Sequence, residues 1–290
     1  MNQAGSSRKP LAFSALLLGA AAIAFAPIFV RLADTAPSAS AFWRVALAVM
    51  PLWFWVWMSP RSVQIRCLPW KPLAIAGLCF AGDLAAWHVS IVYTSVANST
   101  LEANFAPIFV TLGAWLLFRQ RVSRLFLIAL AVTLGGAALL IGPSIALGGR
   151  TLLGDALGVL TAVFYAGYML AIKSASARTT TAGIMAISTT IAAIALFPYS
   201  LATADAFVPL SANGWLVLAG LALIPHIAGQ SLIAYGFAHL PAAFSSVSLL
   251  LQPVLAAIYA WALLGEAVAP IQMLGGLVVL AGIYLARRGS

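Results

Sequence analysis

The chain has 290 residues, of which 63% are hydrophobic and only 7% are charged. Soluble domains carry about 25% charged residues, so this composition excludes a water-soluble globular domain and predicts an integral membrane protein. The net charge of +9 would suggest a nucleic-acid partner in a soluble protein, but here the basic residues follow the ends of hydrophobic segments. We therefore expect membrane lipid around the chain and no nucleic-acid partner.

Ten hydrophobic segments are each long enough to cross a bilayer as a helix, which takes roughly 20 apolar residues. In chain order they cover residues 11–32, 38–58, 72–94, 96–118, 123–142, 153–173, 181–203, 213–238, 241–264 and 270–286. The first resembles a signal peptide, but its apolar run is too long for one, and we interpret it as a retained span. The connecting loops leave no room for a separate soluble domain.

The distribution of basic residues predicts the orientation of these spans. With the N-terminus inside, the cytoplasmic side holds twelve Lys and Arg residues, whereas the outer loops hold Arg150 alone. The twelve are Arg8, Lys9, Arg61, Arg66, Lys71, Arg119, Arg121, Arg124, Lys173, Arg178, Arg287 and Arg288. Cytoplasmic loops carry an excess of Lys and Arg, so both termini are predicted to be cytoplasmic. The two cysteines, Cys67 and Cys79, are expected to be thiols, because neither position favours a disulfide.

The second half of the chain repeats the first. Residues 93–139 align with residues 239–285 without a gap, at an offset of 146. Identical pairs include Ala97/Ala243, Ser99/Ser245, Pro107/Pro253, Trp115/Trp261, Val132/Val278 and Gly136/Gly282. Five helices per half is an odd number, so the second half must enter the membrane the opposite way round. We predict an all-α fold of two inverted five-helix repeats, residues 1–143 and 144–290, which together form one membrane domain.

Glycines and prolines inside the spans predict packing and bending. Gly135, Gly136, Gly275, Gly276 and Gly282 lie in equivalent spans and favour close helix packing. Pro27, Pro107, Pro225 and Pro253 each remove a backbone hydrogen bond and favour a kink. Pro107 and Pro253 are repeat partners, which makes them candidate hinges; a static bend needed for packing is an equal alternative.

Polar side chains inside a bilayer are costly and tend to be functional. The candidates for a substrate site or central cavity are Asp83, Trp87, His88, Asn98, Glu102, Tyr165, Tyr168, His226, Gln230, Ser245, Ser248 and Gln252. Residues four apart share a helix face, which pairs Asp83 with Trp87, Asn98 with Glu102 and His226 with Gln230. For each histidine and aromatic residue, ordinary packing and hydrogen bonding remain an alternative to substrate contact or proton relay.

Arg44 lies within the second span, at a depth similar to that of Glu102 in the fourth. An isolated charge there costs at least about 2.5–3.5 kcal/mol, so we expect Arg44 to pair with Glu102 or Asp83. Such a pair can be structural, or it can form a gate or a site for a substrate carboxylate.

The repeated segment resembles the EamA domain of the drug/metabolite transporter superfamily. The second copy has the fuller signature: Pro253, an alanine-rich helix to Trp261, Leu264-Gly265-Glu266, Gly275-Gly276 and Gly282. The first copy keeps Pro107 and Trp115 but has Phe118-Arg119-Gln120 in place of the glycine and glutamate. The opening residues 26–31 and 42–44 are also similar to the family. The resemblance implies a ten-helix exporter, with bacterial aromatic amino acid exporters as the first comparison within the family.

The sequence and the resemblance together predict a secondary transporter in the bacterial inner membrane. It is expected to export small metabolites, most plausibly aromatic or other hydrophobic amino acids, by alternating access through a cavity between the repeats. A drug or other metabolite exporter is the first alternative, and a channel or an intramembrane lipid enzyme is the second. The pattern of an ATP-binding P-loop is absent from the sequence. No enzyme activity, cofactor or metal is expected, and a monomer is compatible with the sequence.

Overall fold

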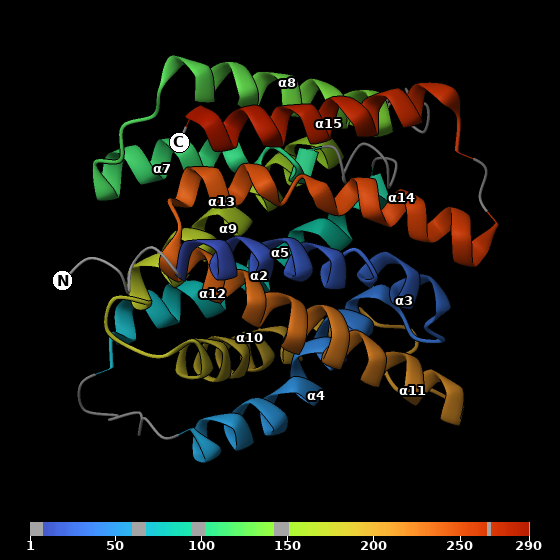
Figure 1. The fold of residues 1–290 in the computed structure, drawn as a ribbon. Coiled ribbons are helices and arrows are strands. Elements are labelled where there is room, and N and C mark those ends of the chain that lie inside the picture. Colours follow the sequence, from blue (N-terminus) through green and yellow to red (C-terminus); the bar gives the residue numbers. More distant parts are fainter. Residues whose placement is uncertain (1–7, 60–67, 94–101, 142–150, 266–267, 290) are drawn as a thin grey trace. The chain divides into compact units, whose positions relative to one another are not determined.

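The computed structural model describes residues 8–59, 68–93, 102–141, 151–265 and 268–289, and its regular elements are helices (Figure 1). The first half contains α2 (Arg8–Ile23), α3 (Ala26–Leu32), α4 (Pro37–Met58), α5 (Trp70–Tyr93), α7 (Ala106–Phe118) and α8 (Arg124–Ile141). The second half contains α9 (Thr151–Ala175), α10 (Thr181–Thr203), α11 (Ala212–Leu221), the π-helix η3 (Ala222–Gln230), α12 (Ser231–His239), α13 (Ala242–Ser248), α14 (Leu251–Leu264) and α15 (Pro270–Gly289).

Seven helical stretches of the described chain are long and apolar enough to cross a membrane. They are Lys9–Leu32, Pro37–Met58, Leu152–Ala175, Thr181–Thr203, Ala212–His239, Ala242–Leu263 and Pro270–Gly289. Two shorter apolar helices cover Ala106–Phe118 and Arg124–Leu140. Eight of these nine helices coincide within a few residues with a segment expected from the sequence, because runs of Leu, Ile, Val and Ala both form helices and avoid water. Ala106–Phe118 ends with the expected span 96–118 but begins ten residues later.

Prolines mark most of the places where a predicted span is interrupted. The first span breaks at Ala24–Phe25, just before Pro27, and the ninth breaks at Leu249–Leu250, before Pro253. Pro225 lies inside η3, where the wider turn tolerates the missing backbone donor. The α-helix is therefore interrupted shortly before Pro27 and Pro253 and becomes a π-helix around Pro225, whereas the kinks expected at these prolines stay predictions.

A proline does not always interrupt its helix in this chain. Pro51 and Pro198 also lie inside helices, but α4 and α10 continue through them as α-helix. Sequence reasoning had singled out neither residue.

The same six residues, Phe-Ala-Pro-Ile-Phe-Val, begin both α3 and α7. They fold alike at both places: the residues before each helix, Phe25 and Phe105, have φ/ψ of −75°/−17° and −76°/−7°. The proline falls at the start of each helix, where its fixed φ is compatible and its missing N–H costs nothing. The interruption is therefore encoded locally, by the hexapeptide itself.

The described chain divides into two compact units that do not follow the two sequence halves. Unit 1 comprises residues 1–85 and 167–239, and unit 2 comprises residues 86–166 and 240–290. Each unit combines segments from both halves. The predicted boundary between repeats, at residues 143 and 144, lies in a stretch outside the described residues.

In unit 1, α4 packs along α10, and α2 packs along η3 and α12. Small residues permit this approach: a Cβ built on Gly19 would lie 2.9 Å from the carbonyl oxygen of Gly229 and 3.1 Å from the backbone nitrogen of Ile233. Gly77 of α5 is equally close to Ile191 of α10. These close approaches hold the helices that carry the polar side chains described below.

In unit 2, α8 and α15 run side by side (Figure 1). A Cβ on Gly136 would lie 2.7 Å from the backbone nitrogen of Val279, and one on Gly275 would lie 2.5 Å from that of Leu140. Gly282 abuts Thr133 in the same way. The packing role expected for these three glycines is confirmed. Gly276 makes only ordinary contacts, and Gly135 has nothing within 4 Å, so the packing role expected for Gly135 is wrong.

Candidate functional site

The most polar part of the interior of unit 1 surrounds Phe80 of α5. Its ring lies 4.8 Å from that of Tyr168 and 5.3 Å from that of His226, between ring centroids. The guanidinium of Arg44 lies 5.7 Å from the centre of the Phe80 ring, within the range of a cation–π interaction. We call Arg44, Phe80, Asp83, Tyr168, His226 and Gln230 the Phe80 cluster.

Four different segments supply the polar groups of this cluster. Arg44 is buried on α4 and interacts electrostatically with Asp83 of α5 and with His226 of η3. The Tyr168 hydroxyl of α9 donates a 3.3 Å hydrogen bond to Oε1 of Gln230. The pairing hypothesis for Arg44 and Asp83 is thus compatible with their positions. Arg44 and Glu102 belong to different units, and their relation stays a prediction.

His226 has one satisfied and one unsatisfied ring nitrogen. Its Nε2 lies 3.0 Å from the Thr189 hydroxyl of α10, whereas its Nδ1 is buried and finds no hydrogen-bond partner among the described residues. A buried polar atom without a partner costs about 1–3 kcal/mol. A buried nitrogen without a partner therefore needs an explanation. His226 also lies in a π-helix, and single π-turns often occur at functional sites.

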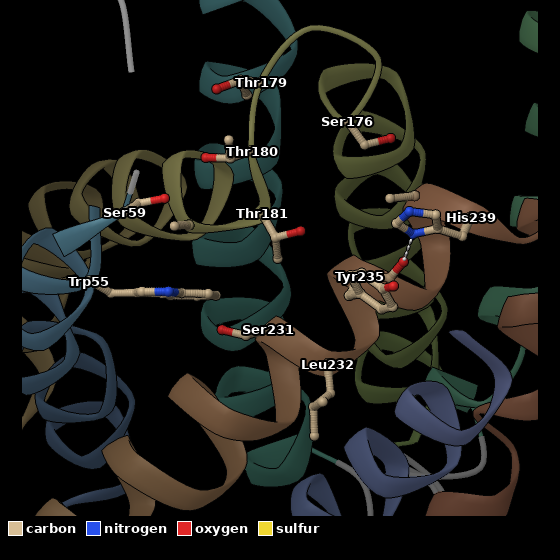
Figure 2. Close-up of a pocket in the computed structure, with 12 residues that line it drawn as sticks. Trp55, Ser59, Ser176, Thr179, Thr180, Thr181, Ser231, Leu232, Tyr235 and His239 are labelled. Carbon is tan, nitrogen blue, oxygen red and sulfur yellow. Dashed lines mark hydrogen bonds between the residues drawn. The ribbon is translucent and has the colours of Figure 1, made fainter. Parts of the chain in front are cut away.

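A cavity of about 820 Å³ lies in the same unit. Its lining consists mainly of hydroxyl and aromatic side chains (Figure 2). The residues are Trp55, Ser59, Ser176, Thr179, Thr180, Thr181, Ala182, Ser231, Leu232, Tyr235, Ala238 and His239. None of these described lining residues is Asp, Glu, Lys or Arg, so the part of the lining that the structure describes offers hydrogen bonds and aromatic faces. We call it the hydroxyl cavity.

Some of these hydroxyl groups support the fold and others are available. Thr180 caps α10 by accepting from the backbone nitrogen of Gly183, and Ser176 donates to the Lys173 carbonyl. The Ser231 Oγ is shielded from solvent and has no partner among the described residues. His239 Nδ1 lies 2.9 Å from the Tyr235 carbonyl oxygen, a hydrogen bond drawn as a dashed line in Figure 2. Because that oxygen can only accept, Nδ1 must be the donor.

The hydroxyl cavity and the Phe80 cluster lie on the same helices at different depths. On α10, Thr181 lines the cavity, Met185 contacts the Tyr168 hydroxyl, and Thr189 contacts His226. These residues are four apart, so they follow one face of the helix. Eight helical residues correspond to roughly 12 Å.

The other segments repeat this arrangement. Ser176, which follows the end of α9, and Tyr168 of α9 are also eight residues apart. At the junction of η3 and α12 the adjacent residues Gln230 and Ser231 belong to the cluster and the cavity respectively. The cavity and the cluster therefore follow one another along these segments.

An aromatic group closes the opposite end of these helices in unit 1. Phe42 stacks on Phe207 with 5.5 Å between ring centroids, and Trp43 meets Trp215 edge to face at 4.9 Å. The Trp43 indole nitrogen donates to the Phe207 carbonyl at 2.8 Å. Phe197 of α10 joins the group, eight residues beyond Thr189. Unit 1 thus has a cavity at one end, polar groups in its middle and packed rings at its other end.

The remaining candidates that can be placed lie in unit 2. Glu102 shares a side-chain hydrogen bond with Asp155 of α9 and rests against Gly158, one turn further along. Two carboxyl groups can share a hydrogen bond only if one of them carries a proton. Asp155 is not among the site candidates that the sequence analysis named.

Ser245 and Ser248 of α13 are buried, but only Ser248 has a partner for its hydroxyl, the carbonyl of Phe244 at 2.9 Å. The Oγ of Ser245 and the Nε2 of Gln252 are buried without a partner among the described residues. Tyr165 of α9 and Trp87 of α5 are partly buried in this unit. These side chains are the candidate polar groups of unit 2.

Two candidates lie outside the described residues: Asn98, and the side chain of His88. Sequence reasoning missed Phe80, because a search for polar residues passes over a phenylalanine, and Thr189, because a single threonine in a span is common. It also missed the hydroxyl residues around 176–181. A signal for these was present in the run of Ser and Thr at the ends of two predicted spans. Among the described residues no group of three or more His, Cys, Asp or Glu could hold a metal.

Comparison with known proteins adds an independent line of evidence. The model of the EamA-like transporter family matches residues 10–142 and 152–288. The pseudopaline exporter of Pseudomonas aeruginosa is 26% identical over 255 residues, which is 87% of each chain. The probable terminal-alkyne amino-acid exporter of Streptantibioticus cattleyicolor is 28% identical over 225 residues, 75% of this chain and 74% of that protein. These relatives do not support identification with an aromatic amino acid exporter.

The fold also matches a solved structure. A crystal structure with 16% sequence identity superposes with a TM-score of 0.82 and covers 97% of both chains. At that identity the likeness concerns the fold alone. Nearly the whole chain, including the helices of both units, thus has a counterpart in an experimentally determined arrangement.

Proposed function

Because this chain belongs to the EamA-like transporter family, we propose that it is a secondary exporter of small amphipathic metabolites, with amino acids as the leading substrate class. In this proposal ten spans form two inverted five-helix repeats, both termini are cytoplasmic, and the protein resides in the bacterial inner membrane. The two similar exporters support export as the direction of transport, and the one that acts on an amino acid supports the substrate class.

One observation carries the proposal: the hydroxyl cavity and the Phe80 cluster follow one another along the same segments of unit 1, most clearly along one face of α10. The described lining of hydroxyl and aromatic side chains suits a small polar molecule such as a zwitterion, and its aromatic faces suit an apolar side chain. Deeper in unit 1, Arg44 offers a partner for a carboxylate and Asp83 a partner for an ammonium group. The unpartnered His226 Nδ1 and Ser231 Oγ are then hydrogen-bonding groups for the substrate along this path.

The aromatic group at the far end of unit 1 suggests how the substrate is held. Trp43, Phe207 and Trp215 pack where the helices would reach the outer side, while the cavity lies at the end where the cytoplasmic loops are predicted. This corresponds to a state open to the cytoplasm and closed by rings toward the outside. Alternating access would require these rings to separate, and the breaks before Pro107 and Pro253 are the proposed hinges.

Counterflow in proteoliposomes tests the proposal. A carrier exchanges labelled phenylalanine outside the vesicle for unlabelled phenylalanine inside, whereas a channel or a lipid enzyme gives no such exchange. Replacing Tyr168 by Phe removes the hydroxyl that binds Gln230, a hydrogen bond worth about 1 kcal/mol, so KM should rise severalfold. Tyr284→Phe is the matched control, since Tyr284 is exposed on α15. If no amino acid exchanges, the substrate class is wrong although the family assignment stands.

A further inference from the structure

We propose that unit 2 carries a binding site for an anionic phospholipid headgroup, of the kind found in phosphatidylglycerol, where the ends of α7, α8 and α15 meet. The site is a pocket of about 230 Å³. One water occupies roughly 30 Å³ of liquid, so the pocket admits a headgroup of several heavy atoms and excludes a whole lipid. Phe126 and Phe244 form its apolar part, and Gln120, Arg121 and the backbone of Gly289 are among its polar lining.

Hydrogen bonds bring the chain end against the start of α8. The Ser123 hydroxyl donates to the Gly289 carbonyl at 2.6 Å and accepts from the backbone nitrogen of Phe126 at 3.1 Å. This places the last turn of α15, with Arg287 and Arg288, beside the first turn of α8. The backbone nitrogens at the start of a helix favour an anion. The basic residues Arg287 and Arg288 belong to the helix turn held beside this helix start, and the Arg288 guanidinium donates to the Tyr284 hydroxyl.

Five arginines gather at this end of unit 2: Arg119, Arg121, Arg124, Arg287 and Arg288. The carboxylates of the described part of unit 2 are Glu102 and Asp155, which interact with each other. Glu102 precedes Arg119 by seventeen residues, which is roughly 25 Å along a helix. In the sequence no Asp or Glu occurs between Glu102 and Asp155 or after Glu266, so these segments of the chain are strongly basic.

The backbone conformation of Arg119 is strained. It ends α7 with φ of 53°, in the left-handed region. Its counterpart in the duplicated segment is Gly265, which ends α14 with φ of 68°. Glycine adopts this conformation without strain, so glycine would give the more stable backbone at this helix end. A strained residue that is retained points to a role beyond ending the helix.

Gln120 indicates which anionic headgroup fits. Its Oε1 is shielded from solvent and accepts no hydrogen bond from the described residues. An amide oxygen needs a donor, and a phosphodiester group by itself supplies none, because it carries no proton at neutral pH. A phosphodiester with a glycerol headgroup supplies both groups: the negative charge for the arginines and a hydroxyl for Gln120.

The surroundings favour a lipid over a dissolved phosphate compound. Leu116 and Leu117, in the last turn of α7, are 61% and 68% exposed, and Ile128 in α8 is 58% exposed. In a membrane these faces contact acyl chains, so the arginines lie at the level of the headgroups. Basic pockets at this level bind anionic headgroups in membrane proteins.

The test compares lipid binding by two variants that lose the same charge. Arg121→Gln with Arg124→Gln alters the pocket, and Lys71→Gln with Arg178→Gln removes two exposed basic residues from unit 1. Purified proteins in neutral detergent are titrated with phosphatidylglycerol or phosphatidylcholine, and bound lipid is measured by native mass spectrometry. We expect the pocket variant to bind phosphatidylglycerol about tenfold or more weakly and the control to bind as the parent protein does.

A third variant and a competitor test the identity of the headgroup. Gln120→Leu should reduce the preference for phosphatidylglycerol over phosphatidylmethanol, a phosphodiester of the same charge that lacks the glycerol hydroxyls, without abolishing anionic lipid binding. Equal losses in the two charge variants would show a general charge effect and overturn the site. Displacement of the lipid by glycerol phosphate at equal concentration would overturn the lipid in favour of a soluble phosphate compound. An unchanged lipid preference in Gln120→Leu would overturn the glycerol headgroup.

Discussion

At the scale of single residues, one position of the duplicated segment has a different side chain in each of the two copies. Arg119 and Gly265 both end a helix with positive φ, at 53° and 68°, and both follow the same proline and tryptophan in their copies. The backbone geometry has been kept while the side chain has changed. Since the left-handed conformation costs an ordinary residue roughly 1–2 kcal/mol, the two positions should respond in opposite ways to substitution.

Arg119→Gly should stabilise the protein by about 0.5–1 kcal/mol, because it removes this strain and restores the usual helix end. Gly265→Ala should destabilise it by about 1 kcal/mol, since alanine is forced into the same left-handed conformation. Thermal unfolding in neutral detergent, without anionic lipid, measures both effects. A lower melting temperature for Arg119→Gly would show that the arginine side chain stabilises the fold by more than its backbone strain costs.

Single residues also show how far the candidate site could be predicted from the sequence. Arg44, Tyr168, His226 and Gln230 were predictable, because polar groups inside a membrane must find partners and the structure places them together. Phe80 was not, because its role depends on which rings surround it. The hydroxyl cavity was not predictable either, because Thr179 and Ser231 are far apart in the sequence and line the same cavity only in the folded structure.

At the scale of elements, neighbouring glycines in α8 have opposite surroundings. Gly136 faces α15 so closely that a Cβ would lie 2.9 Å from the Gly275 carbonyl oxygen, whereas Gly135 has open space around it. Helix pairs in membranes depend on such close approach, because lipid gives little hydrophobic force to hold two helices together. The periodicity of small residues predicted the packing but could not tell which of the two glycines faces the partner helix.

Gly136→Ala should therefore lower stability by about 1–3 kcal/mol, as α8 and α15 must move apart to admit the methyl group. Gly135→Ala should be neutral or stabilise by up to about 1 kcal/mol, because alanine is the better helix former. The two variants add the same atoms one residue apart, so comparing their melting temperatures isolates the packing effect. Equal destabilisation by both would contradict the described orientation of α8.

Sequence reasoning located most helix ends within one or two residues, as for α10, which spans the predicted residues 181–203. It did not predict that η3 is π-helical, since a wider turn depends on what the helix packs against. Pro51 and Pro198 show the same limit. Their local sequence favours a kink, but α4 and α10 lie along each other and continue as α-helix.

At the scale of the whole molecule, the boundaries of the two compact units do not coincide with the boundary between the two sequence repeats. Unit 1 contains most of the first three predicted spans of the first half together with α10, α11 and α12 of the second, and unit 2 contains α7 and α8 with α13, α14 and α15. The hydroxyl cavity is accordingly lined by residues 55 and 59 from one half and residues 176–239 from the other. A site built from both copies is what a duplicated transporter is expected to have.

The proposed topology places the hydroxyl cavity on the cytoplasmic side and Leu210, which is 94% exposed, on the outside. Single cysteines test this in a chain whose own cysteines are replaced by serine. A membrane-impermeant maleimide added to intact cells should label Leu210→Cys and leave Thr179→Cys unlabelled, and inverted membrane vesicles should give the reverse. Labelling of both positions from one side would contradict the inverted repeat.

Protection by substrate then tests whether the cavity is on the transport path. Thr179 lines the cavity, whereas Ala177 is exposed in the same loop and does not. A transported amino acid present during the reaction should slow the labelling of Thr179→Cys and leave Ala177→Cys unchanged. Since both cysteines meet the same reagent at the same surface, a difference between them can arise only from occupancy or closure of the cavity. Equal rates with and without substrate would place the path elsewhere in the molecule.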